Sequence, residues 1–136
     1  MPILIGIVLA LAVGIFATGT GLDRDRAFYP TITIFIAALY ILFAVMGGST
    51  YALLLDSLQG SLFIIAAVVG FKRSLWIVVG ALAGHGIMDT MHYAVINNPG
   101  VPSFWPGFCS AYDIAAAAYL AWLLLNGRVH AAASSA

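Results

Sequence analysis

Five long apolar runs, separated by short polar breaks, dominate the amino-acid sequence. A helix needs about 20 mostly apolar residues to cross the roughly 30 Å hydrocarbon core of a bilayer, and each run is close to that length. Strands of membrane barrels are about ten residues long and alternate in polarity, so these runs predict helices. The sequence therefore predicts an all-α integral membrane protein with a single transmembrane domain over residues 1–136, a bundle of five transmembrane helices. The expected spans are about 2–18, 28–46, 50–71, 74–96 and 107–126.

The small number of charges excludes several classes of protein. Hydrophobic residues make up 63% of the chain and charged residues 7%, whereas about 25% of an ordinary soluble domain is charged. Five basic and five acidic residues cannot cover the surface of a soluble domain. A net charge of zero gives no attraction to nucleic acid. The composition excludes a soluble enzyme, a disordered chain and a nucleic-acid-binding protein, and it predicts membrane lipids as the surroundings.

All the basic residues fall on one side of the predicted bundle. Alternation of the spans places the segments 19–27 and 71–74 on the same side as the C-terminal tail. Positive charge marks the cytoplasmic side, so we predict that the N-terminus is outside and the C-terminus inside. The run at 23–26 is interpreted as a topology signal with a local ion-pair network, and residues 127–136 as a disordered tail. The basic residues are Arg24, Arg26, Lys72, Arg73 and Arg128.

Three aspartates lie at a similar depth in three of the predicted spans. Asp56, Asp89 and Asp113 are each about 9–10 Å below the outer end of their helix. A carboxylate at such depth costs at least about 2.5–3.5 kcal/mol, so each one needs a partner, a proton or water. We therefore expect the three side chains to face one another inside the bundle, in the outer half of the membrane.

Two histidines accompany these aspartates. His85, Asp89 and His92 form one stripe along a helix, because they are separated by four and three residues. The expected ligands of a single divalent metal ion are Asp56, Asp89, His92 and Asp113, and His85 is expected to be a further hydrogen-bonding partner or proton acceptor. Imidazole and carboxylate ligands suit zinc first, then iron or manganese. Carboxyl–histidine hydrogen bonds without a metal are the alternative.

The chain's one cysteine and an apolar loop lie close to these residues in the sequence. Cys109 is one turn from Asp113, and we interpret it as a small buried hydrophobe, with a ligand or nucleophile as the alternative. The loop 97–106 contains prolines and no charge, so its side chains gain by leaving water. We expect it to fold back over the bundle as a lid, with Phe104 or Trp105 against the outer end of the third or fifth helix.

Three motifs together resemble a family of small bacterial membrane proteins of unknown function. They are Asp-Arg-Asp-Arg-x-Phe-Tyr-Pro at 23–30, Gly-His-Gly-x-x-Asp-x-x-His at 84–92 and Asn-Pro-Gly-Val-Pro-x-x-Trp-Pro-x-Phe-Cys at 98–109. The resemblance covers nearly the whole chain and implies a multi-pass protein of the bacterial inner membrane. The histidine and aspartate pattern also resembles intramembrane zinc hydrolases of the alkaline ceramidase type, which have more helices and a differently spaced ligand set.

The sequence supports three functions. The first is a membrane-embedded, metal-dependent enzyme of the hydrolase kind, acting on a lipid-like or hydrophobic substrate that enters from the bilayer or under the loop. Its catalytic residues would be Asp89, His85 and Asp56. The second is a proton or cation transporter or a channel subunit, and the third is a non-catalytic metal or haem carrier. The small interior of a five-helix bundle also favours a homo-oligomer.

Overall fold

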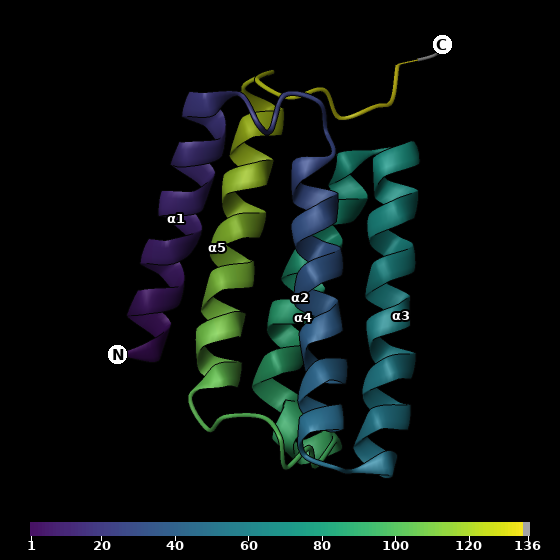
Figure 1. Cartoon of the computed structure of the whole chain (residues 1–136). Coiled ribbons are helices and arrows are strands. Elements are labelled where there is room, and N and C mark those ends of the chain that lie inside the picture. The colour runs from purple at the N-terminus through teal and green to yellow at the C-terminus, as the bar shows by residue number, and fades with distance from the viewer. Residues whose placement is uncertain (135–136) are drawn as a thin grey trace.

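The computed structural model describes residues 1–134, which fold into five α-helices lying side by side (Figure 1). Residues 1–134 contain no β-strand, and a single isolated bridge pairs Ser74 with Ala132. The prediction of an all-helical chain is confirmed. The helices are α1 (Pro2–Thr20), α2 (Phe28–Met46), α3 (Thr50–Lys72), α4 (Leu75–Val95) and α5 (Trp105–Leu125).

Local signals set the ends of the helices, which agree with the expected spans to within two residues. Gly21 ends α1 in the left-handed conformation, with φ of 82°. Ser49 caps α3 by accepting a hydrogen bond of 3.1 Å from the Ala52 backbone N–H. Helix α5 begins at Trp105, two residues earlier than expected. Pro106 falls in its first turn, where a proline removes no helical hydrogen bond, so it does not delay the helix.

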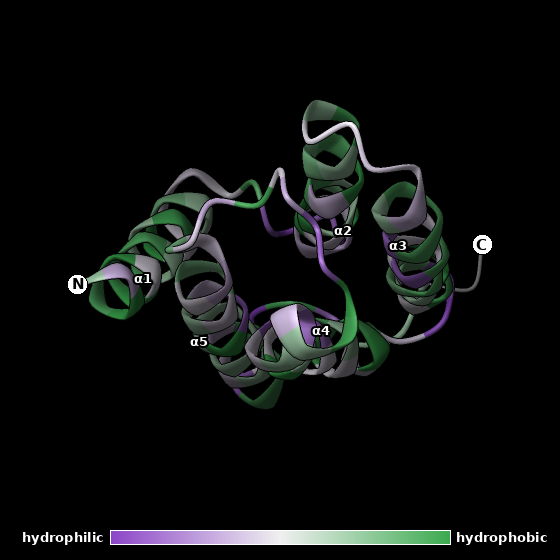
Figure 2. Ribbon diagram, turned by 90° about the horizontal axis from the view of Figure 1, so that it is seen from below, coloured by the Kyte–Doolittle hydropathy of each residue, from purple (hydrophilic) through white to green (hydrophobic). Residues whose placement is uncertain are grey.

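Helix α4 lies between α5 and α3, across from α2, and contacts all three of these helices (Figure 2). Helix α1 packs against α5, and α2 packs against α3. Glycines bring α1 close to α5, because a Cβ on Gly6 would overlap the Phe108 carbonyl oxygen and one on Gly14 would lie 2.8 Å from the Tyr119 ring. The pair α1–α5 and the pair α2–α3 are therefore joined mainly through α4.

Four of the helices could cross a membrane. Helices α1, α2, α3 and α5 are long and apolar enough, with mean hydropathies of 2.4, 2.1, 2.0 and 1.6. Helix α4 is as long as α5, at 21 residues. It is more polar, since it carries His85, Asp89 and His92. All three of these side chains are buried inside the bundle. The structure thus supports a membrane protein and confirms four of the five expected spans by length and composition.

The C-terminal tail is held against the end of the bundle where α1, α3 and α5 finish (Figure 1). The Arg26 guanidinium donates hydrogen bonds of 2.8 and 2.9 Å to the carbonyl oxygens of His130 and Ala131. These hydrogen bonds place the tail against the bundle, and the expected disorder over 127–136 stays a prediction. Residues 135–136 lie outside the described part of the chain.

The acidic and basic run that precedes α2 makes no ion pair within residues 1–134, where every close pair of opposite charges involves a histidine. Arg26 instead donates a third hydrogen bond, of 2.9 Å, to the Phe71 carbonyl oxygen near the end of α3. Asp23 is buried and accepts a hydrogen bond of 2.7 Å from the Thr18 hydroxyl. The prediction of a local ion-pair network is therefore wrong. Carbonyl groups at the helix ends compete with the aspartates for the arginine.

The loop between α4 and α5 folds back over the opposite end of the bundle. It passes so close to α2 that a Cβ on Gly100 would overlap the Phe43 carbonyl oxygen. The Trp105 and Phe43 rings pack edge to face with centroids 5.1 Å apart, whereas Phe104 is 53% exposed. The Trp105 ring also lies 5.3 Å from the Phe108 ring in the first turn of α5. The expected contact with the fifth helix is therefore present, and the contact with α2 is an additional one.

Candidate functional site

Five ionisable side chains lie inside the bundle, and none of them is more than 2% exposed. Their burial agrees with the cost of turning a carboxylate toward lipid. They form two separate groups, and the Tyr40 ring lies near a histidine of each group. The five are Asp56 on α3, His85, Asp89 and His92 on α4, and Asp113 on α5.

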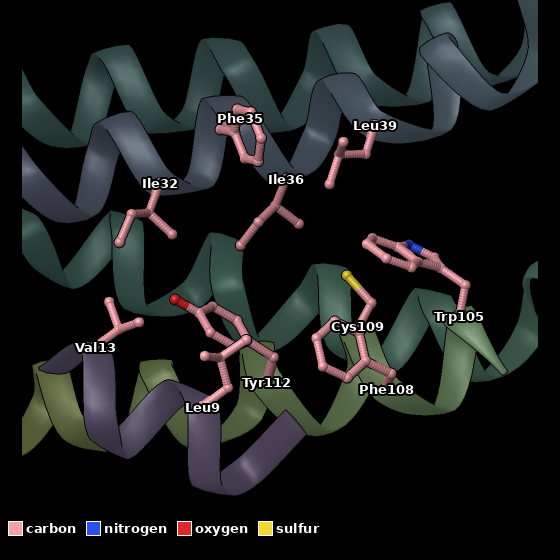
Figure 3. A pocket seen from close by; sticks show the side chains of 10 residues that line it. All are labelled: Leu9, Val13, Ile32, Phe35, Ile36, Leu39, Trp105, Phe108, Cys109 and Tyr112. Carbon is pink, nitrogen blue, oxygen red and sulfur yellow. The ribbon is translucent and has the colours of Figure 1, made fainter. Parts of the chain in front are cut away.

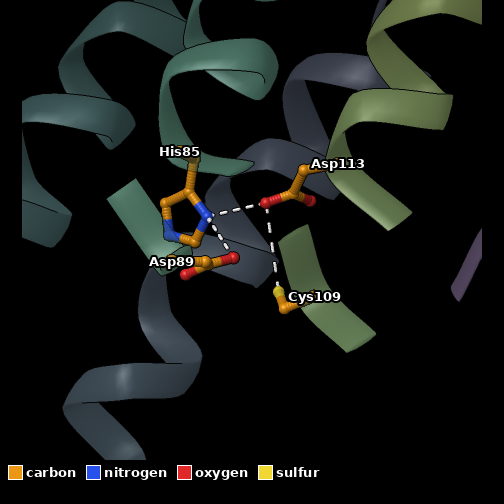
Figure 4. A group of neighbouring side chains, drawn as sticks. All are labelled: His85, Asp89, Cys109 and Asp113. Carbon is orange, nitrogen blue, oxygen red and sulfur yellow. Dashed lines mark hydrogen bonds and ion pairs between the residues drawn. The ribbon is translucent and has the colours of Figure 1, made fainter. Parts of the chain in front are cut away.

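His85 is the centre of the first group, shown in Figure 4. Its Nδ1 lies 2.7 Å from Asp113 Oδ2, at hydrogen-bonding distance, and 3.6 Å from Asp89 Oδ2. The Cys109 sulfur lies 3.9 Å from Asp113 Oδ2. Each of the four residues offers a ligand atom within 4.8 Å of the others, so this group, the His85 cluster, could hold a metal ion.

The His85 cluster keeps several polar atoms without a hydrogen-bond partner among the described residues. These atoms are His85 Nε2, both carboxylate oxygens of Asp89, and Asp113 Oδ1. A buried polar atom that lacks a partner costs about 1–3 kcal/mol, and more when it carries charge. A cation bound among the carboxylates would offset that cost, so the donor set fits a metal.

Helical spacing and one glycine assemble the cluster. His85 and Asp89 are four residues apart on α4, as are Cys109 and Asp113 on α5, so each pair shares one helix face. A Cβ on Gly86 would lie 3.1 Å from Asp113 Cβ. The absence of a side chain at Gly86 therefore lets α4 approach α5 closely enough for His85 to reach Asp113.

Replacing Gly86 with leucine is expected to push α4 away from α5 and to lower the affinity of the cluster for a divalent metal ion by at least about tenfold, because displacing a ligand's support weakens a metal site by about that much. Gly80→Leu is the matched control, since a Cβ at Gly80 has no other atom within 4 Å. Competition with a chromogenic chelator in detergent measures both affinities. Equal affinities in the two variants would show that this close approach does not form the site.

His92 and Asp56 form the second group together with Asn98. His92 Nε2 lies 2.9 Å from Asp56 Oδ1, and Asn98 donates a hydrogen bond of 2.7 Å to Asp56 Oδ2. Asn98 also donates a hydrogen bond of 3.1 Å to the Tyr40 carbonyl oxygen, which ties the loop to α2. The Tyr40 ring stacks on His92 with centroids 4.1 Å apart and lies 6.0 Å from the His85 ring. The Tyr40 ring is therefore a neighbour of both groups.

The structure divides the four ligands that the sequence predicts. Asp89 and Asp113 belong to the His85 cluster, whereas Asp56 and His92 pair with each other and lie outside the set of atoms within 4.8 Å. The four residues therefore do not converge on one ion, as the sequence predicts, but form two pairs. Hydrogen bonds already occupy both Asp56 oxygens. His85, expected to be an outer partner, is the central residue of the cluster.

Two members of these groups were not assigned to a site by the sequence. The sequence favours a buried hydrophobe at Cys109, although its spacing from Asp113 places both on one helix face. Cys109 is buried as expected, and its sulfur also lies in the His85 cluster. From the sequence, Asn98 is predicted only to belong to the loop that follows the fourth helix. No local pattern reveals that it folds back onto Asp56.

An apolar pocket of about 310 Å³ reaches the His85 cluster at Cys109 (Figure 3). This lateral pocket lies between α1, α2 and α5, and no charged side chain lines it. Its walls come from Leu9 and Val13 on α1, from Ile32 to Leu39 on α2, and from Trp105 to Tyr112 on α5. Cys109 is the one residue that the pocket and the cluster share, so the pocket borders the cluster at this residue.

Comparison with known proteins finds no relative, since no family model, no curated protein and no solved structure matches the chain. The resemblance to small bacterial membrane proteins stays a prediction. The function is therefore argued from the site.

Proposed function

We propose that this protein is a membrane-embedded, metal-dependent hydrolase that acts on a hydrophobic substrate. The observation that carries the proposal is the His85 cluster, in which an imidazole, two carboxylates and a thiol lie within 4.8 Å of one another. A buried group of ionisable residues among apolar helices is costly and marks a functional site. The lateral pocket adds an apolar cavity that borders that group.

Zinc fits the donor set best. It accepts imidazole nitrogen together with carboxylate oxygen, whereas magnesium and calcium prefer oxygen and copper(I) prefers sulfur. Zinc–ligand bonds of about 2.0–2.2 Å place tetrahedral donors roughly 3.3–3.6 Å apart. The distance of 3.6 Å between His85 Nδ1 and Asp89 Oδ2 fits that spacing, whereas the contact of 2.7 Å between His85 and Asp113 is a hydrogen bond that metal binding would replace. His85, Asp89 and Asp113 would be the ligands, and Cys109, the fourth member of the cluster, lines the lateral pocket.

The chemistry is hydrolysis of a carbonyl compound. A zinc ion at this position supplies a Lewis acid that activates water and polarises a carbonyl group. Asp89 would hold the metal through one carboxylate oxygen, and its second oxygen, which also has no hydrogen-bond partner among the described residues, would take a proton from the attacking water and pass it to the leaving group. The water oxygen bonds to the carbonyl carbon and the bond to the leaving group breaks. An ester or amide thus yields an acid and an alcohol or amine.

The proposal includes five helices across the membrane. Helix α4 crosses together with the four apolar helices, because it lies among them and its polar side chains are buried. The end with the basic residues faces the cytoplasm by the positive-inside rule, so the N-terminus is outside. The bacterial inner membrane is the location that the family resemblance implies.

Metal analysis of the purified protein tests the proposal. We expect about one zinc ion per chain, as in catalytic zinc sites, and release of fatty acid from acyl esters or amides that stops on chelation and returns with zinc. No bound metal, together with proton or cation flux in liposomes, would favour a transporter instead. A bound metal without hydrolysis of any acyl compound would favour a metal carrier.

A further inference from the structure

The mouth of the lateral pocket lies on the apolar side of the bundle. Leu9 on α1 and Phe35 on α2 line the pocket and are 42% and 66% exposed. Both belong to helices that are long and apolar enough to cross a membrane. In a bilayer such surface faces acyl chains and not water. A ligand therefore reaches this pocket from the lipid phase.

The lining of the pocket selects an uncharged, largely hydrocarbon ligand. Its polar atoms are limited to the Tyr112 hydroxyl, the Cys109 thiol and the Trp105 indole nitrogen. The indole N–H is buried and has no hydrogen-bond partner among the described residues. A charged group would find no counter-ion here, which excludes a charged lipid headgroup from the pocket.

The size of the pocket restricts the ligand further. A volume of about 310 Å³ is at the low end of the roughly 300–1,000 Å³ seen for small-molecule sites. The wall from Ile32 to Leu39 on α2 extends about 10 Å along the helix axis. These dimensions suit one hydrocarbon chain and not the two chains of a bilayer phospholipid.

We propose that the lateral pocket binds the hydrocarbon chain of a single-chain acyl ester or acyl amide, with its carbonyl group beside Cys109. The chain then lies along α2 toward Ile32, and its far end leaves through the mouth between Leu9 and Phe35. This names the substrate class and rests on the proposed hydrolase function, since the carbonyl group lies at the point where the pocket meets the His85 cluster.

Quenching of tryptophan fluorescence by a brominated lipid tests the proposal without a reaction. The probe is a long-chain fatty acid methyl ester, dibrominated in the carboxyl half of the chain, in phosphatidylcholine nanodiscs. The protein is treated with EDTA and carries Trp76→Phe and Trp122→Phe, so that Trp105 is the only tryptophan. We expect saturable quenching of Trp105. A reference protein that keeps only Trp122, which is outside the pocket, shows the unsaturable quenching caused by bulk lipid.

A matched pair of substitutions locates the binding. Leu39→Phe fills part of the pocket and is expected to weaken the probe's binding at least about tenfold. Leu42→Phe changes the same residue type on the same helix outside the pocket, at a position 51% exposed, and is expected to leave binding unchanged. Unsaturable quenching of Trp105, or equal effects of the two substitutions, would overturn the proposal. Saturable binding by a protein that never hydrolyses acyl compounds supports the pocket and overturns only the proposed reaction.

Discussion

Replacing His85 with glutamine is expected to lower zinc affinity at least about 100-fold, whereas the same replacement at His92 is expected to leave affinity within a few-fold of the unmodified protein. The two histidines differ in their positions relative to the proposed metal site. His85 contacts both Asp89 and Asp113, whereas His92 contacts Asp56. Loss of a residue that hydrogen-bonds to a metal ligand lowers metal affinity about 10–100-fold, so loss of the ligand itself lowers the affinity by at least as much. Glutamine keeps an amide donor, so Asp56 retains a partner in His92→Gln.

Zinc titration of both variants in the same detergent gives the comparison, with thermal unfolding as the check that each variant folds. The opposite result, metal lost with His92→Gln and kept with His85→Gln, would restore the ligand set that the sequence predicts. Cys109→Ser serves as an internal control, because Cys109 is the member of the cluster that is not among the three proposed ligands, so its replacement should leave zinc bound.

Replacing Asn98 with alanine is expected to lower the free energy of unfolding by about 2–4 kcal/mol. The substitution removes the donor to a buried carboxylate oxygen of Asp56 and the donor to the Tyr40 carbonyl oxygen. It also removes the side-chain oxygen that accepts a hydrogen bond of 3.0 Å from the Gly100 N–H. The loop over this end of the bundle would lose its attachment to both α2 and α3.

Unfolding by titration with sodium dodecyl sulfate in mixed micelles measures this loss. Asn97→Ala is the matched control, because Asn97 is the preceding residue of the same type and is exposed. An effect below 1 kcal/mol for Asn98→Ala, or an equal effect for both substitutions, would show that hydration of Asp56 replaces the amide in the folded protein.

The helices were predictable because their signals are local. The run from Thr50 to Lys72 is apolar over a membrane's thickness, begins after a serine cap and ends at basic residues. Burial of Asp56, Asp89 and Asp113 was predictable for an equally simple reason, since a carboxylate among lipid chains costs several kcal/mol wherever its helix lies. Neither inference requires knowledge of which helices are neighbours.

The partners of those carboxylates were not predictable in this way. Depth along a helix says nothing about its rotation or about the helix beside it, so four residues at similar depth read as a single ligand set. The close approach at Gly86 turns His85 toward Asp113, and the loop returns Asn98 to Asp56.

The C-terminal tail also shows the difference between what the local sequence predicts and what packing decides. Its alanines and serines carry no pattern of structure, yet Arg26, about 100 positions earlier in the chain, binds its carbonyl groups. Three factors act within one segment: the length of the apolar run, the end caps and the cost of burying charge. They determine where each helix lies in the sequence and at what depth its polar residues lie. Pairing of side chains between segments depends on the order of helices around α4, which only the packed bundle decides, because contact energies between helices exist only once the helices are neighbours.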